Sequence, residues 1–175
     1  MQTLMTMNVA ALKAAALCVS KDKEAKLPFT VVRLEWDGQN LAVVVMDLTH
    51  IFCARVHYEI PEGAGVSPFV LNVPAAVIGK LPKAGHVALC ATDDYRHALG
   101  DVVFTSVDTP YPPWRRLVAS SGPAGELAPA VLDPTIGELG KKALATYHGV
   151  NVKSQSFSFG YYPQQGKPTV MFFGD

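Results

Sequence analysis

Apolar and polar residues alternate along the chain in a way that predicts three helices, each followed by strands. Residues 7–20 are rich in alanine and leucine, and their apolar positions recur at helical spacing behind Asn8, which can cap a helix. Proline at a first helical turn and Pro82 just beyond bracket a short second helix at residues 74–81. Asp133-Pro134 opens a third helix, which Gly149 closes.

Two of these helices have a clear apolar face. The apolar positions are Val9, Leu12, Ala16 and Val19 in the first helix, and Ile136, Leu139, Ala143 and Tyr147 in the third.

The stretches between the helices are typical of antiparallel strands. The expected strands are residues 29–36, 41–47, 52–59, 69–73, 86–91, 95–99, 102–106, 154–161 and 169–173. Asp37-Gly38-Gln39-Asn40 predicts a hairpin, and Asp93-Asp94 and Gly100-Asp101 predict turns. The repeated order of a helix and then strands predicts an α+β fold in which such units pack through their sheets, with the helices on one face.

The stretch 119–125, rich in serine, glycine and proline, predicts a boundary. It divides the chain into a domain of two units, residues 1–118, and an additional half-domain, residues 119–175. Just before it, residues 111–117 hold two prolines, Trp114 and two arginines directly after a strand-like run. Since proline fixes φ and lacks an N–H, we expect an extended connector that presents its aromatic and cationic groups as one wall of a binding groove.

Composition narrows the class of protein. With 49% hydrophobic and 17% charged residues the 175-residue chain is globular. Its longest apolar runs fall far short of the ~20 residues of a membrane span, and the first residues lack the basic start of a signal peptide, so we expect a cytoplasmic protein. Cys18, Cys53 and Cys90 are odd in number and set among apolar neighbours, which predicts reduced, buried thiols.

The net charge is zero, which excludes a protein that binds nucleic acid through a large overall positive charge. The lysines are nevertheless unevenly placed, because eight of the ten lie on or beside the predicted helices. These eight are Lys13, Lys21, Lys23, Lys26, Lys80, Lys83, Lys141 and Lys142. If the helices share a face, that face is basic.

One cluster invites an enzymatic interpretation. Cys90, Asp93, Asp94, Tyr95 and His97 fall within eight residues, but their spacing matches no metal site, and proximity in sequence does not define a catalytic triad. No glycine-rich phosphate-binding pattern occurs. We therefore expect no catalytic residues, no metal and no cofactor.

Several segments together resemble the bacterial DNA polymerase III beta subunit, the sliding clamp, or a short phage-type relative. The resemblance runs from about residue 7 to residue 117 and ends in Pro-Pro-Trp-Arg-Arg-Leu at residues 112–117, which is similar to the family's Pro-Asp-Tyr-Arg-Arg-Val. Residues 133–175 resemble the family's last half-domain. Where the family has Thr-Asp-Gly-His-Arg-Leu, residues 46–51 read Met-Asp-Leu-Thr-His-Ile, and the loop at residues 20–26 lacks the family's adjacent tyrosines.

The resemblance implies a DNA-clamp-like processivity factor used in replication or repair. Its helices would contact duplex DNA, without reading sequence, through the eight lysines. A hydrophobic cleft would bind short peptides of DNA polymerases or clamp loaders; its residues would be Leu48, Thr49, His50, Ile51, Pro112, Trp114, Arg116, Leu117, Val170 and Met171. Because rings of this family contain about twelve such units, chains of three units would close as a homo-oligomer of about four.

Other interpretations stay open. The chain could be a clamp-derived interaction module that keeps the peptide cleft but does not encircle DNA, or a small cytosolic enzyme. Trp114 could equally be a core or linker-packing aromatic, and Arg115 and Arg116 could be ion-pair donors to Asp47 or Asp108. The lysines could serve solubility alone.

Overall fold

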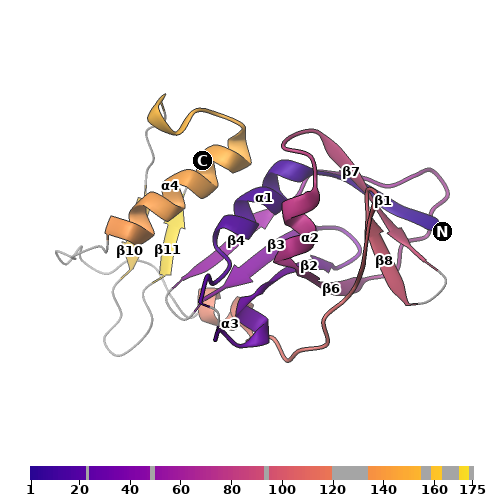
Figure 1. Cartoon of the computed structure of the whole chain (residues 1–175), viewed down its shortest axis with the longest axis horizontal. Coiled ribbons are helices and arrows are strands. Elements are labelled where there is room, and N and C mark those ends of the chain that lie inside the picture. Colours follow the sequence, from indigo (N-terminus) through magenta and orange to yellow (C-terminus); the bar gives the residue numbers. More distant parts are fainter. Residues whose placement is uncertain are drawn as a thin grey trace.

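The structure is a computed structural model that describes residues 1–22, 24–47, 50–92, 95–119, 134–154, 159–162 and 170–173. Nine strands form two antiparallel sheets over the first two-thirds of the chain (Figure 1). Sheet A has the order β5-β1-β7-β8-β9 and sheet B the order β4-β3-β2-β6. Their strands are β1 (Gln2–Asn8), β2 (Val31–Trp36), β3 (Leu41–Met46), β4 (Ile51–Arg55), β5 (Tyr58–Glu59), β6 (Phe69–Pro74), β7 (His86–Ala91), β8 (Arg96–Leu99) and β9 (Val102–Thr105).

The two sheets are built from two similar units that exchange their first strands. In sequence, β1 leads into helix α1 (Val9–Leu17) and then β2, β3 and β4, while β6 leads into helix α2 (Ala75–Lys80) and then β7, β8 and β9. In space, β1 pairs with β7 and β6 pairs with β2, both antiparallel. The strand orders β1-β7-β8-β9 and β6-β2-β3-β4 are therefore equivalent. This arrangement confirms the predicted α+β fold of repeated helix-plus-strands units.

The local signals for the first unit act as predicted. The side chain of Asn8 accepts a hydrogen bond from the backbone N–H of Ala10 at 2.7 Å and so caps α1. The carboxylate of Asp37 accepts from the N–H groups of Gln39 and Asn40, and Gly38 takes a positive φ of 100°, which closes the β2–β3 hairpin.

Helix α1 lies at the centre of the fold. It contacts α2, strands of sheet B and helix α4 (Pro134–His148), and most of its side chains are fully buried. The core joins side chains of both sheets and α1 to Ala143 of α4, with Leu139 and Tyr147 packed against them. The predicted apolar face of the third helix is thus the face that packs on the first unit, and α1, α2 and α4 lie together (Figure 1).

The third unit continues from α4 through the short 3-10 helix η2 (Val152–Ser154) to β10 (Phe159–Tyr162) and β11 (Val170–Phe173). These two strands form an antiparallel pair in which Phe159 lies opposite Phe173. The predicted division after residue 118 falls inside helix α3 (Trp114–Ala119) and stays a prediction, as does the turn at Asp93-Asp94, which lies outside the described residues.

Four predictions about the elements were wrong. Residues 2–8 form strand β1, so the first helix begins at Val9 and not at residue 7. The expected strand at residues 52–59 is two strands, β4 and β5, and a short 3-10 helix η1 (Leu27–Phe29) replaces the start of the expected strand at 29. The connector expected to be extended over residues 111–117 becomes helical at Trp114, because the prolines restrict the backbone only before that residue.

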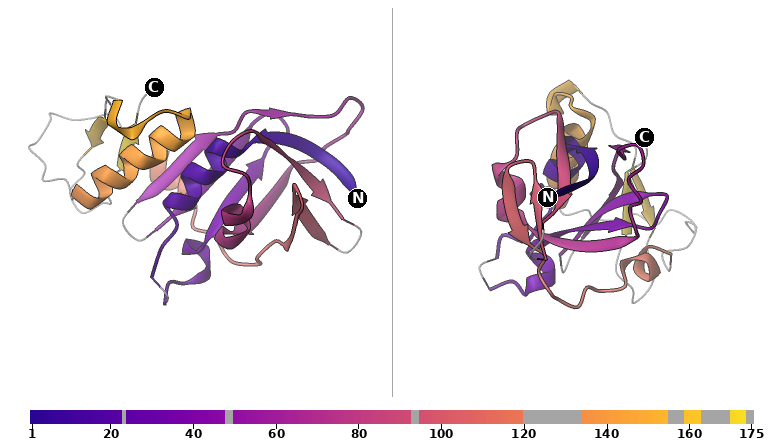
Figure 2. Two further views of the ribbon diagram at one scale, coloured as in Figure 1. Left: turned by 45° about the horizontal axis from the view of Figure 1, so that its top comes forward. Right: turned by 90° about the vertical axis from the view of Figure 1, so that its right-hand side faces the viewer.

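Helix α3 lies on the other side of sheet B from α1 and α4 (Figure 2). It was not predicted, and it is the one α-helix of the described residues that lies apart from α1, α2 and α4.

Two further expectations concern the cysteines and membranes. All three cysteines are free; Cys18 and Cys90 are buried as expected, but Cys53 is exposed, because it points from β4 to the face of sheet B opposite the core. Within the described ranges, no helix is long and apolar enough to cross a membrane.

Candidate functional site

The candidate site is the outer face of sheet B, where the segment after β9 crosses the sheet. In β2, Leu34 and Trp36 point into the core, so Arg33 and Glu35 point outward. Val44 and Met46 of β3 point outward by the same alternation, since Val43 and Val45 belong to the core. Glu35, Val44 and Met46 are nevertheless buried. These three residues are buried because residues 106–116 cross this face of the sheet and cover it.

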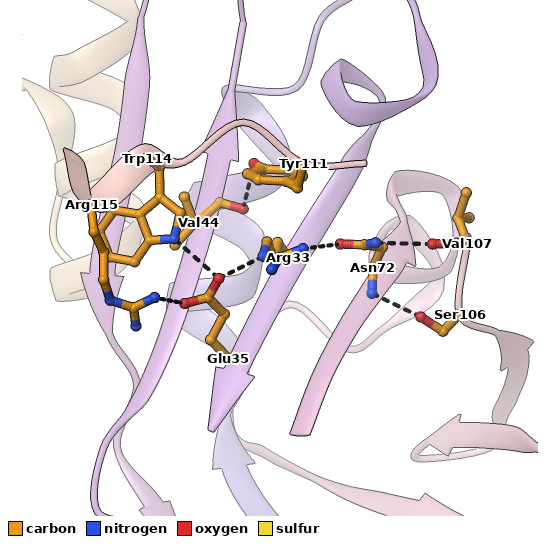
Figure 3. A network of polar contacts seen from close by, with 9 residues as sticks. All are labelled: Arg33, Glu35, Val44, Asn72, Ser106, Val107, Tyr111, Trp114 and Arg115. Atoms are coloured by element: carbon orange, nitrogen blue, oxygen red, sulfur yellow. Dashed lines mark hydrogen bonds and ion pairs between the residues drawn. The ribbon is translucent and has the colours of Figure 1, made fainter. Parts of the chain in front are cut away.

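Glu35 is the centre of the contacts between this cover and the sheet (Figure 3). Its Oε1 accepts hydrogen bonds from the indole Nε1 of Trp114 at 3.1 Å and from Nε of Arg33 at 2.6 Å. Its Oε2 is paired with the guanidinium of Arg115. The side chain of Glu35 is only 7% exposed, so these three donors replace the water that a carboxylate would otherwise bind.

The pKa of Glu35 reflects this balance. Burial alone would raise it, but the hydrogen bonds from Arg33, Trp114 and Arg115, together with the charge of Arg115, outweigh burial and hold the pKa of this carboxyl below its usual value. Glu35 is therefore ionised at neutral pH, and the network carries one buried negative charge shared by two arginines.

A second set of contacts fastens the beginning of the crossing segment to β6. The backbone N–H of Val107 donates to the carbonyl of Asn72 at 2.9 Å, and the Asn72 side chain donates to the carbonyl of Val107 at 2.9 Å. The hydroxyl of Ser106 accepts from the Asn72 backbone N–H. Arg33 links the two sets, because its guanidinium also donates to the Asn72 side-chain oxygen at 3.3 Å.

Tyr111 lies between these two sets (Figure 3). The guanidinium of Arg33 lies over its ring, 4.7 Å from the centroid, and its hydroxyl donates to the carbonyl of Val44 at 3.4 Å. Burial raises the pKa of Tyr111, so its hydroxyl stays protonated and keeps its role as a donor at neutral pH.

The predicted peptide-cleft residues fall into three groups. Ile51 and Trp114 both lie on the outer side of sheet B, Ile51 opposite the buried Met46 and Trp114 on Glu35. His50 instead contacts the carbonyl of Cys18 through Nε2 at 3.0 Å.

The remaining cleft residues are less fully described. Pro112 is half-buried and Arg116 is exposed. The backbone of Leu117 lies in α3 and that of Val170 and Met171 in β11, while Leu48 and Thr49 lie outside the described residues. The cleft as a whole stays a prediction.

The predicted DNA-binding lysines differ in their contacts and in their exposure to solvent. Lys13 donates from Nζ to the carbonyl oxygens of Ile78, Gly79 and Leu81 at 2.7, 3.3 and 2.8 Å. Lys141 is half-buried, Lys23 lies outside the described residues, and the others are exposed: Lys21, Lys26, Lys80, Lys83 and Lys142. Their role in binding DNA stays a prediction.

The residues that sequence reasoning missed are Glu35, Arg33 and Asn72; Tyr111 belonged to the predicted connector but was not assigned to the cleft. A signal was present for the first two, because they are the charged positions of the otherwise apolar strand Val-Val-Arg-Leu-Glu-Trp. Charges two residues apart in a strand point to the same face. The ion-pair role considered for Arg115 is met by Glu35.

A separate hollow of about 220 Å³ lies between the start of α1 and the end of α4. It is lined by Asn8, Ala10, Ala11, His57, Tyr147 and His148. Among the described residues, no group of three or more histidines, cysteines or acidic residues is placed to hold a metal ion.

No protein-family model matches the chain, and no curated protein matches it in sequence. Solved structures do resemble it. The beta clamp of Helicobacter pylori, bound to a DNA ligase peptide, is 14% identical with a TM-score of 0.49, and the match covers 66% of this chain and 36% of that one. The DNA polymerase III beta subunits of Thermotoga maritima and Streptococcus pyogenes are 20% and 12% identical, with TM-scores of 0.46 and 0.47. These matches cover 77% and 75% of this chain but only 37% and 36% of those chains, so the chain spans about a third of the length of the solved structures that it resembles.

Proposed function

We propose that the chain is a non-catalytic, clamp-like tether that binds short peptides of replication or repair proteins beside α3, and that contacts duplex DNA through the lysines of its helices. The observation that carries the proposal is the docking of Tyr111, Trp114 and Arg115 on the outer face of sheet B. These residues belong to the segment whose sequence resembles the peptide-binding connector of sliding clamps. The pair of strand-exchanged units supports the same interpretation.

Trp114 is suited to serve as the aromatic anchor of such a surface. Its indole N–H is bound to Glu35, so the ring is fixed, and the side chain remains partly exposed. Fixed aromatic side chains with one apolar surface open to solvent are frequent hot spots for peptide binding.

The peptide part of the proposal is tested by fluorescence anisotropy with labelled peptides from DNA polymerases and clamp loaders. We expect Trp114→Ala to weaken binding by ~1–3 kcal/mol. The matched control is Tyr95→Ala, since Tyr95 is 94% exposed at the β7–β8 hairpin of the other sheet. Equal losses from both substitutions, or no loss from either, would argue against a peptide surface at α3.

The DNA part is tested by the salt dependence of binding to a duplex of random sequence. Each lysine that neutralises a phosphate contributes about 0.9 to the slope of log K against log salt. Replacing Lys80, Lys83, Lys141 and Lys142 by glutamine should therefore flatten the slope. Lys153→Gln, in the exposed segment after α4, is the control. An unchanged slope in the fourfold variant would rule out the lysines of α2 and α4 as DNA contacts, and absence of binding by the parent chain would remove duplex DNA as a partner.

A second candidate function is a peptide-binding module that does not encircle DNA. It is favoured by Lys13, whose ammonium group is engaged by three carbonyl oxygens of the α2 end, and by α1, which is mostly buried between α2, α4 and sheet B. The central helix therefore offers little cationic surface. Light scattering separates the two candidates: a mass near four chains supports a ring, and a mass near one chain supports the module.

A further inference from the structure

The indole ring of Trp114 is held in a single orientation. Its Nε1–H donates to Oε1 of Glu35 at 3.1 Å, which turns the polar edge of the ring toward sheet B. The guanidinium of Arg115 lies 4.4 Å from the ring centroid and covers one of its two faces. That guanidinium is itself fixed, because it pairs with Oε2 of the same glutamate.

The hydrogen bond of the indole and the ion pair of Arg115 are therefore both made with the carboxylate of Glu35. Trp114 and Arg115 are the first two residues of α3, and they follow two prolines that make no backbone N–H bonds of their own. Within the described part of the chain, Glu35 of sheet B accepts hydrogen bonds from the side chains of both Trp114 and Arg115. Glu35 also accepts a hydrogen bond from Nε of Arg33. The guanidinium of Arg33 lies over the ring of Tyr111, so Arg33 connects Glu35 to the earlier part of the crossing segment.

We propose that Glu35 is the positioning residue of the peptide surface: it fixes the start of α3 and leaves the face of the Trp114 ring opposite Arg115 as the contact for an apolar side chain of the bound peptide. The proposal rests on the proposed function for the peptide, but the placement of the indole by Glu35 can be measured without any peptide. Glu35 does not itself touch the peptide in this scheme; it acts through Trp114 and Arg115.

The experiment uses the full chain with Trp36→Phe, so that Trp114 is the only tryptophan of the two in the sequence. In this background, Glu35→Ala removes both acceptors, while Glu35→Gln keeps an oxygen that can accept from the indole but loses the charge that holds Arg115. Glu59→Gln, on the exposed edge strand β5, is the matched control. All variants are compared at a temperature at which circular dichroism shows them folded.

We expect acrylamide to quench Trp114 at least twofold more strongly in the Glu35→Ala variant than in its parent, and peptide affinity to fall at least tenfold. Glu35→Gln should lie between the two, and Glu59→Gln should match the parent. A loss of peptide affinity that follows the quenching across the series is a result that a change in global stability alone would not give. If Glu35→Ala does not fold, Glu35→Leu replaces it, because it also removes both acceptors and fills the buried position with an apolar side chain of similar size.

The outcomes are separable. Unchanged quenching in Glu35→Gln and in Glu35→Ala or its replacement overturns the positioning role, even if peptide binds. Changed quenching with unchanged affinity also overturns it, and leaves the proposed function intact. A parent chain that binds none of the peptides overturns the proposed function and the role of Glu35 in recognition, while the quenching series still decides whether Glu35 holds the indole.

Discussion

The ammonium group of Lys13, on α1, lies 2.7 Å from the carbonyl oxygen of Ile78, near the end of α2. The last carbonyls of a helix have no partner within the helix, and a positive charge there also interacts favourably with the negative end of the helix dipole. The same group reaches the carbonyls of Gly79 and Leu81. One lysine thus caps one helix from another, and burial lowers its pKa.

We predict that Lys13→Met destabilises the fold by about 1 kcal/mol, because the capping bonds and the dipole interaction are lost together. Urea denaturation measures the change. Lys142→Met, exposed on α4, should stay within about 0.5 kcal/mol of wild type. In DNA binding we expect the opposite order, with Lys142→Met the more harmful; a larger loss of DNA affinity in Lys13→Met would show that the ammonium leaves the α2 end to bind phosphate.

Two glycines should respond to alanine with opposite signs. Gly38 takes a φ of 100° in the β2–β3 hairpin, which a residue with a Cβ adopts only under strain, so Gly38→Ala should destabilise by about 1 kcal/mol. The added Cβ would meet only Pro68 at 3.9 Å, so the cost comes from the backbone and not from a clash.

Gly79 lies in α2, and a Cβ there would have no neighbour within 4 Å. Gly79→Ala should therefore stabilise by about 0.5–1 kcal/mol, because alanine loses less backbone entropy in a helix. Thermal melts of the two variants test the pair. A gain in melting temperature for Gly38→Ala, or a loss for Gly79→Ala, would contradict the assigned conformations.

The parts of the fold that were predicted correctly depend on neighbouring residues. The Asn8 cap and the Asp37 hairpin bonds span two or three positions, and the periodicity of residues 134–148 is a property of one helix. Strand β1 was missed although Met5 and Met7 alternate with polar neighbours, because its partner β7 lies about eighty residues further along.

The site was predicted only in its connector. Trp114 and Arg115 attracted attention through the local Pro-Pro-Trp-Arg-Arg pattern, but their acceptor, Glu35, is 79 and 80 residues away. No local rule turns the start of α3 toward that carboxylate. The position of α3 depends on which β2 side chains point outward and on the burial of the Glu35 carboxylate. Both are settled only when the strands of sheet B have paired.

The three cysteines should differ in reactivity. Burial raises the pKa of Cys18 to about 12, and Cys90 is buried beside Thr3, its Sγ 3.6 Å from the threonine hydroxyl. Partial burial raises the pKa of Cys53 as well, but Cys53 is the exposed cysteine, on the outer face of sheet B, so its accessibility sets it apart from the other two. At pH 8 we expect a thiol reagent such as dithionitrobenzoate to modify one cysteine of the folded chain and all three in denaturant. Cys53→Ser should abolish the reaction of the folded chain; if it does not, Cys18 or Cys90 is accessible through local opening.

Glu35 should make the free energy of unfolding depend on pH in the acidic range. Its pKa in the folded chain is lowered below the value of 4.5 that it has when unperturbed, so the unfolded chain binds its proton first as the pH falls. The stabilisation from this carboxylate is complete above that unperturbed value and is lost as the pH falls through the lower folded pKa. Glu35→Gln lacks the titration, so its free energy of unfolding should lie below that of wild type by a constant amount above about pH 6, with the gap narrowing below about pH 4.5. Urea denaturation between pH 3 and pH 7 measures both curves, with Glu59→Gln as the control. A gap that widens toward acid would mean that the carboxylate is held at a raised pKa, and that burial outweighs the donors from Arg33, Trp114 and Arg115.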